Sequence, residues 1–329
     1  MAHRILAGLG VTPSRRRFAL ALALVAGAPI AGLTLPARAQ SFPSKPVTIV
    51  VPFAPGGGTD TLIRIMGPRL SEVWKQPVVI ENKPGASGHL GADLVAKAPA
   101  DGHVLLMGST AAISEKNVDK FAAVSLVSAD AYVIVVNPNV PVRNLSDLIA
   151  YAKQRPGQVK FGSSGVGAAS HLSGELFKSM AGVDLLHVPY KGTGQAVTDL
   201  LGGHIQLMFA PTQTVLQHVK TGKLRALGVT GTKPEALLPE VPTAMAAGVA
   251  GYTAQGWFGL LAPRATPAAI VQRLNADIQK VMAMTDIRER LLATGAEPGT
   301  LTSAEFDRFV RDEQDKWARL MKANGIVVE

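Results

Sequence analysis

The residues best suited to chemistry lie in a glycine-rich loop, Pro55-Gly56-Gly57-Gly58-Thr59-Asp60. The β-branched apolar run at residues 47–51 before it predicts a buried strand, and residues 61–74 after it have the spacing of a helix. Thr59 and Asp60 are residue types that begin helices. Free backbone N–H groups at the positive end of a helix suit an anion. A tight turn between strand and helix is the simpler interpretation of one such loop.

Repetition of this arrangement favours anion binding. Three further predicted strands lead into loops rich in glycine and hydroxyl residues, at residues 108–110, 162–171 and 189–195. In open α/β sheets such loops gather at the carboxyl ends of the strands, where ligands bind. We therefore expect a cleft between two domains, with N–H groups and hydroxyls contributed by both.

The sequence lacks the motifs of several enzyme classes. The first loop has no Gly-Lys-Ser/Thr ending of a P-loop, and Ser170 stands where a dinucleotide fingerprint needs its third glycine. No nucleophile elbow and no His-x-x-x-His pair occurs. His171 and His187 are expected to be structural, with ligand contact as the alternative. We predict no catalytic residues, no cofactor and no metal site.

Short apolar runs alternate with helical segments, which predicts an α/β fold with parallel sheets. After Pro263 the pattern is helical only, and Thr302 with Glu305 forms a capping box before the last helix. These last helices are expected to pack on the first domain, which makes that domain discontinuous. Strands are expected at residues 47–51, 78–80, 104–107, 132–136, 159–161, 185–188, 205–209, 226–229 and 257–261, and helices include 145–154, 171–180, 196–201 and 214–221.

Residues 1–39 have the features of an export signal. Three arginines precede an apolar stretch at 18–35, and Ala37-Arg38-Ala39 is a small-x-small cleavage site. General secretion and the twin-arginine route both fit this pattern. We expect cleavage near Ala39 and a periplasmic location. The rest of the chain is predicted to form domain 1 from residues 40–131 plus 257–329, and domain 2 from residues 132–256.

The composition limits the partners. The net charge is +9, but five arginines lie in residues 1–39, so the remainder carries only +4. Clusters of Lys and Arg with interleaved aromatic residues are absent from the sequence, which argues against nucleic acid binding. The chain has no cysteine, so its stability depends on core burial instead of disulfides. We expect a soluble monomer.

Further motifs run through the whole chain in order. They are Pro43-Ser44-Lys45-Pro46, Val50 to Asp60, Val79 to Ala86, His187-Val188-Pro189-Tyr190-Lys191-Gly192, Asp199 to Gly203, Val241-Pro242-Thr243 and Trp257 to Pro263. Together they make the chain similar to the substrate-binding receptors of tripartite tricarboxylate transporters, the Bug family of periplasmic binding proteins.

The resemblance implies a type II periplasmic-binding-protein fold, with two α/β domains joined by two crossing strands and a ligand cleft between them. Family members close around a small carboxylate and deliver it to membrane permease subunits. A sensor or scavenger without a transport partner is the alternative, and an enzyme of the same fold class is the least favoured.

The resemblance also implies which residues hold the ligand. One carboxylate would lie between two facing loops, held by Gly57, Gly58, Thr59 and Asp60 on one side and by Ser163, Ser164, Gly167 and Ser170 on the other. Ser109, Thr110, Tyr190 and Lys191 would line the rest, and His171 is an additional candidate contact.

The chain departs from the family in two places. Its Ala111–Phe121 segment is shorter than usual, so we expect an altered wall of the cleft. Ala210 stands where some members carry an acid, which favours a simple carboxylate over an amino acid if that position faces the ligand.

Overall fold

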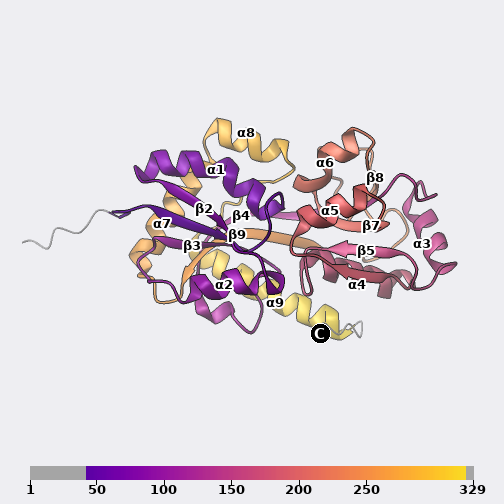
Figure 1. Cartoon of the computed structure of the whole chain (residues 1–329), viewed down its shortest axis with the longest axis horizontal. Helices are drawn as coiled ribbons and strands as arrows, with labels where there is room; N and C mark the ends of the chain where they lie inside the picture. The colour runs from indigo at the N-terminus through magenta and orange to yellow at the C-terminus, as the bar shows by residue number, and fades with distance from the viewer. Residues whose placement is uncertain (1–41, 324–329) are drawn as a thin grey trace, which may run out of the picture. The chain divides into compact units, whose positions relative to one another are not determined.

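The computed structural model describes residues 42–323 (Figure 1). Residues 42–323 belong to one compact unit. The predicted export signal and its cleavage point near Ala39 lie outside the described residues. Among those described, no helix combines the length and the apolar character that a membrane span requires.

One half of the fold is built on three parallel strands and an antiparallel fourth. The central strand β1 pairs in parallel with β2 and β3, and β3 pairs with β9 in the antiparallel sense. Apolar side chains on one face of these strands pack against α1, α7 and α8, and those on the other face pack against α2 and α9. The elements are β1 (Val47–Val51), α1 (Gly58–Trp74), β2 (Val78–Asn82), η1 (Ala86–Gly88), α2 (His89–Ala96), β3 (Val104–Ser109), η2 (Val118–Lys120), β9 (Gln255–Pro263), α7 (Ala268–Met282), α8 (Thr285–Ala293) and α9 (Ser303–Ala323).

The other half repeats this layering. Strand β5 pairs in parallel with β6 and β7, with α4 on one face of the strands and α5 and α6 on the other. The elements are α3 (Leu145–Lys153), β5 (Lys160–Ser163), α4 (Ala169–Ala181), β6 (Leu186–Pro189), α5 (Thr193–Leu201), β7 (Leu207–Pro211), α6 (Thr212–Lys220) and β8 (Arg225–Val229). We call the half around β1 the first lobe and the half around β5 the second lobe.

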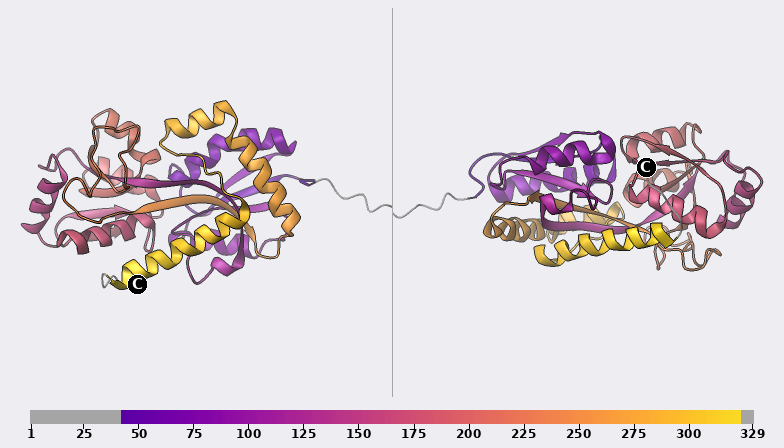
Figure 2. Two further views of the ribbon diagram at one scale, coloured as in Figure 1. Left: turned by 180° about the vertical axis from the view of Figure 1, so that it is seen from behind. Right: turned by 90° about the horizontal axis from the view of Figure 1, so that it is seen from below.

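A long strand, β4 (Phe121–Val136), joins the two halves. Its residues 121–131 pair with β9, and its residues 132–136 pair with β7 and β8, all in the antiparallel sense. The sheet order is therefore β2-β1-β3-β9-β4-β7-β5-β6, with β8 attached to β4. Figure 2 shows β4 and β9 side by side along their shared length.

Two sequence predictions need correction here. The predicted strand at residues 132–136 is only the end of β4, and the sheet is mixed because β4, β8 and β9 run antiparallel to their neighbours. Residues 121–131 escaped prediction because they are rich in Ala and Ser, which have weak strand preference. Ser125 and Ser128 are nevertheless fully buried in this strand.

The C-terminal helices pack more widely than predicted. Helix α7 lies against α1 and β4 in the first lobe, as expected. Helix α9 places Phe306 in a first-lobe cluster, but its Trp317 belongs to a core cluster of the second lobe. The proposed boundaries at 131/132 and 256/257 stay predictions.

The predicted capping box is confirmed at the start of α9. The Thr302 N–H donates to Glu305 Oε2 at 2.9 Å, and the Glu305 N–H donates to Thr302 Oγ1 at 3.3 Å. We expect Thr302→Ala to lower the free energy of unfolding by about 1 kcal/mol, because a backbone N–H loses its acceptor. Denaturant unfolding measures this loss. Thr302→Ser keeps the hydroxyl and should cost little, so an equal loss in both variants would contradict the capping role.

Candidate ligand-binding site

A cavity of about 20 Å³ lies where three helices begin, α1 in the first lobe and α4 and α5 in the second. A single buried water needs roughly 10–15 Å³ on this measure, so the cavity has room for about one water. A dicarboxylate would enter only if the walls moved apart. The lining residues are Phe53, Gly57, Gly58, Thr59, Ser109, Thr110, Ala111, Tyr132, Ser164, Ala168, Ala169, Thr193, Pro211 and Phe258.

The cavity collects part of the sequence-predicted set. Its walls include Gly57, Gly58, Thr59, Ser109, Thr110 and Ser164. Its walls do not include Asp60, Ser163, Gly167, Ser170, His171, Tyr190 and Lys191, which lie around it. The hydrogen bonds of these outer residues explain what they do instead.

The first loop supplies donors as predicted, but Asp60 has a different role. Helix α1 begins at Gly58, so its first-turn N–H groups have no acceptor within the helix. The Asp60 carboxylate accepts from the Gly56 N–H, from Arg64 Nε and from Asn82 Nδ2, each at 2.9–3.0 Å. Burial opposes the ionised form, but these hydrogen bonds outweigh it and lower the pKa of Asp60. Asp60 therefore shapes the loop, and Gly58 and Thr59 line the cavity with the first turn of α1.

In the second loop, most N–H groups are already satisfied internally. The N–H groups of Ser164, Gly165 and Gly167 donate to Ser170 Oγ, Ser163 Oγ and His171 Nδ1, each at 3.1 Å. The first turn of α4 leaves N–H groups without an acceptor inside the helix, and Ala169 is the residue of this turn that lines the cavity. The predicted residues Ser163, Gly167 and His171 thus support the loop without lining the cavity.

The loop before the third helix was predicted, but its residue Thr193 was not among the predicted site residues. Thr193 begins α5 and lines the cavity, and a Cβ added at Gly57 would lie 3.8 Å from the Thr193 nitrogen. The predicted Tyr190 points elsewhere, because its hydroxyl donates to Asp199 Oδ2 at 2.7 Å. The signal for Thr193 was present in the Gly192-Thr193 pair, which resembles the Gly58-Thr59 pair of the first loop.

Lys191 acts through its backbone. The Ala54 N–H in the first lobe donates to the Lys191 carbonyl in the second, at 3.1 Å. Phe53, Ala111 and Ala112 form a buried cluster with Ala168 across the same boundary. The lobes are therefore in direct contact around the cavity.

The rest of the wall is apolar or aromatic. Phe258 lies against the start of α1, where a Cβ at Gly58 would come within 2.8 Å of its ring. Tyr132 and Pro211 are opposite each other in the β4–β7 register. Burial raises the pKa of the Tyr132 phenol, so it stays protonated. None of the residues lining this cavity is Asp, Glu, Lys, Arg or His, so any anion there relies on backbone N–H groups and hydroxyls.

Two predictions about the walls have different outcomes. Ala111, at the start of the Ala111–Phe121 segment, lines the cavity, and the shortening of that segment stays a prediction. Asn117 holds that segment, accepting from the Ser114 N–H at 2.8 Å and donating to the Ala112 carbonyl at 2.9 Å. Ala210 does not face the cavity, because it is buried in the cluster beneath α5 and α6. The condition on which the Ala210 inference depended is therefore not met, and that residue says nothing about the ligand.

Metal binding has no visible basis in the part of the chain that the structure describes. Residues 42–323 contain no group of three His, Asp or Glu side chains placed to hold an ion. The candidate site is thus a cavity without charged lining residues, at the start of three helices that offer N–H donors.

A family model described as the tripartite tricarboxylate transporter family receptor matches residues 62–326. The chain belongs to this family. The resemblance stated from the motifs is confirmed, and so is the prediction of a solute-binding receptor instead of an enzyme.

Three solved structures resemble this receptor over most of its length. R. palustris Rpa4515 with adipate is 36% identical, covers 86% of this chain and 98% of its own, and has a TM-score of 0.82. The periplasmic binding protein BugD is 34% identical, with coverage of 87% and 99% and a TM-score of 0.81. MatC from Rhodopseudomonas palustris with bound malate is 31% identical, with coverage of 85% and 99% and a TM-score of 0.80. The receptor therefore has the type II periplasmic-binding-protein fold, with β4 and β9 as the crossing strands.

Proposed function

We propose that this receptor captures a small carboxylate in the cavity between the starts of α1, α4 and α5. The single observation that carries this proposal is the convergence of three helix N-termini on one cavity. Each helix start offers N–H groups and the positive end of a dipole, and a hydrogen bond to an ionised group contributes about 1.5–3 kcal/mol. Two relatives have adipate and malate bound, and both of these ligands are small dicarboxylates.

Capture is coupled to closure in this proposal. The cavity of about 20 Å³ is too small for a dicarboxylate, so the ligand enters an open form and the lobes close on it. Residues 42–131 plus 257–323 would move against residues 132–256, with β4 and β9 bending at the boundary. Because donors come from both lobes, a bound carboxylate stabilises the closed form selectively.

We further propose that the closed receptor acts in the periplasm and delivers its ligand to the permease subunits of a tripartite tricarboxylate-type transporter. This partnership is supported by family membership. If only the closed receptor docks on the permease, docking occurs only when a ligand is bound.

Calorimetric titration of the purified receptor tests the proposal. Adipate and malate serve as first probes within a panel of mono-, di- and tricarboxylates, with adipamide as the uncharged control. We expect at least one carboxylate to bind and adipamide to bind at least about 100-fold more weakly than adipate if adipate is bound, because two charge-assisted hydrogen bonds are lost. Absence of binding across the panel, or equal binding of adipate and adipamide, would contradict carboxylate capture.

A further inference from the structure

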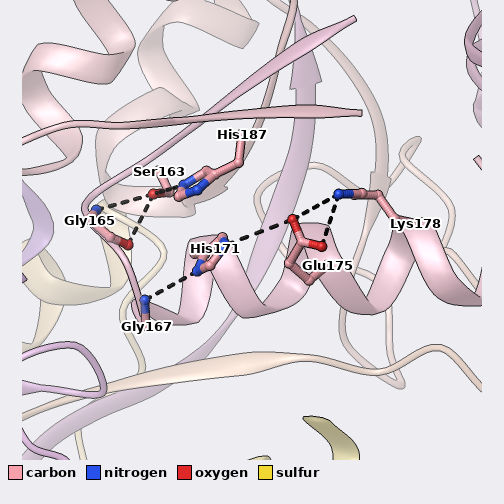
Figure 3. A network of polar contacts seen from close by, with 7 residues as sticks. All are labelled: Ser163, Gly165, Gly167, His171, Glu175, Lys178 and His187. Carbon is pink, nitrogen blue, oxygen red and sulfur yellow. Dashed lines mark hydrogen bonds and ion pairs between the residues drawn. The ribbon is translucent and has the colours of Figure 1, made fainter. Parts of the chain in front are cut away.

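Two histidines are stacked beneath the second loop (Figure 3). His171 lies in the first turn of α4 and His187 lies in β6. Their ring centroids are 3.8 Å apart and their planes differ by 16°. The ring of Phe161 on β5 lies 4.9 Å from that of His187, so three elements enclose the pair. Neither ring lines the cavity.

Each ring contacts a different part of the loop through one of its nitrogens. His171 Nδ1 accepts the Gly167 N–H at 3.1 Å, so this nitrogen carries no proton and the Nε2–H form is present. His187 Nε2 lies 2.6 Å from Ser163 Oγ. Ser163 Oγ in turn accepts the Gly165 N–H at 3.1 Å and donates to the Gly165 carbonyl at 3.0 Å. Figure 3 shows these contacts beside one another under the loop.

The two glycines that the pair holds set the shape of the loop. Gly165 has a φ of +139° and Gly167 a φ of +75°, which other residues rarely adopt. On either side of them, Ser164, Ala168 and Ala169 form a wall of the cavity. Gly165 also touches the first lobe, because a Cβ there would lie 2.7 Å from Ser87 Oγ. The loop therefore controls both the donors of α4 and the contact between lobes.

We propose that His171 and His187 form a neutral stacked pair that acts as a positioning element for the ligand. They do not touch the carboxylate; they hold Gly165 and Gly167 so that the start of α4 faces it. This role rests on the proposed function, the binding of a carboxylate in the cavity.

The surroundings keep the pair neutral. Burial, with the neighbouring ring and Lys178 adding to it, lowers the pKa of His171 to about 3. Burial and Lys178 lower the pKa of His187 to about 4. The charged groups facing the pair lie on α4, while β5 presents the Ser163 hydroxyl. Glu175 is 3.7 Å from His171 Nε2 and by itself favours the protonated ring, but Lys178 is paired with the same carboxylate at 3.0 Å and offsets it, so burial decides. Protonated His171 would point an Nδ1–H at the Gly167 N–H, so that contact would be lost.

Four variants separate hydrogen bonding from packing. His171→Asn and His187→Gln keep a polar atom near Nδ1 and Nε2 respectively, whereas His171→Phe and His187→Phe keep a flat ring without it. With adipate and malate as calorimetric probes, we expect each Phe variant to bind about tenfold more weakly, because a supporting hydrogen bond is lost and the loop relaxes. The Asn and Gln variants should stay within about threefold of wild type.

The outcomes distinguish this inference from the proposed function. Wild type that binds no carboxylate in the panel overturns the proposed function. If the wild-type protein binds a carboxylate and the Phe variants bind it equally tightly, the positioning role is overturned and the proposed function stands. Equal weakening in all four variants also overturns it, because keeping the polar atom would then not preserve binding.

Two measurements on the wild-type protein do not depend on whether variants fold. Nitrogen-15 spectra of the histidine rings should show His171 with an unprotonated Nδ1 at pH 7, and an Nδ1–H form would overturn the assignment. The affinity for the bound probe should change less than about twofold between pH 8 and pH 6, since the pair stays neutral there. A tenfold loss over this range would mean that a histidine titrates near its ordinary pKa, and would overturn the neutral pair.

Discussion

Replacing Gly57 with leucine is expected to weaken carboxylate binding at least about 100-fold while leaving the fold intact. Gly57 has a φ of −83° and ψ of 172°, which any residue adopts, so leucine brings no backbone strain. A Cβ there meets only the Thr193 nitrogen at 3.8 Å and neighbouring atoms near 3.9 Å. The longer leucine side chain, however, would fill a cavity of about 20 Å³ and keep α1 apart from α5.

The size of the effect follows from the donors that would be lost. Separating the two helix starts removes at least two charge-assisted hydrogen bonds of about 1.5–3 kcal/mol each, which corresponds to a hundredfold or more. Gly57→Ala is the matched control, because its single Cβ makes only ordinary contacts and should change affinity by less than about fivefold. Calorimetry gives the affinities, and thermal unfolding checks that both variants fold. If the Gly57→Leu variant binds carboxylate with wild-type affinity, the junction between α1 and α5 is not part of the binding site.

Much of the fold could be predicted from the sequence because its strands are short runs of buried Val, Leu and Ile. Helix starts were predicted two or three residues late: α1 begins at Gly58 instead of Thr61, and α5 begins at Thr193 instead of Ala196. Gly, Ser and Thr in these first turns have low helix preference, and tertiary contacts hold them in helical form. Residues 121–131 of β4 were missed for the related reason that their Ala and Ser are buried by packing that no local pattern records.

The site could be predicted at the level of loops but not of individual donors. Whether the Gly167 N–H is free depends on His171 Nδ1, and whether Asp60 is available depends on Asn82, twenty-two residues away. The lining residues Tyr132 and Phe258 come from crossing strands that no motif connects to the loops. Sequence spacing identifies the loops in which donors gather. Which of these donors already have an acceptor within the protein is decided by the tertiary structure.

Lowering the pH from 7 to 5 is expected to destabilise the receptor, mainly through His171 and His187. Both have an ordinary pKa of 6.5 in the unfolded chain, and pKa values of about 3 and about 4 in the folded protein. Below pH 6.5 the unfolded chain therefore binds protons that the folded protein does not, so stability falls as pH falls. The buried His171 accounts for a loss of roughly 2 kcal/mol at pH 5, and the half-buried His187, which solvent screens, accounts for roughly 1–2 kcal/mol. Burial also lowers the pKa of His89, which acts in the same direction.

One acid opposes this trend. Asp130 in β4 accepts hydrogen bonds from Gln213 Nε2 and the Glu297 N–H, but burial dominates and raises its pKa from 3.8 to about 6. Between pH 6 and 4 the folded protein binds this proton more tightly than the unfolded chain, so Asp130 adds roughly 1 kcal/mol of stability at pH 5. Asp101, with a pKa of about 2, titrates too low to contribute in this range. The net expectation is a loss of about 2–3 kcal/mol.

Urea unfolding at constant ionic strength measures this change at pH 7 and pH 5. The double variant His171→Asn, His187→Gln keeps the polar contacts but removes both titrating rings, so its loss between these pH values should be at least about 2 kcal/mol smaller than in wild type. Asp130→Asn removes the carboxyl whose proton uptake offsets part of the loss. This variant should therefore lose about 1 kcal/mol more stability between pH 7 and pH 5 than wild type. A wild-type stability that is level from pH 7 to pH 5 while the double variant behaves identically would mean that the stacked pair titrates as in the unfolded chain. The neutral pair beneath the ligand loop would then have to be abandoned, because the same burial that enforces neutrality produces this pH dependence.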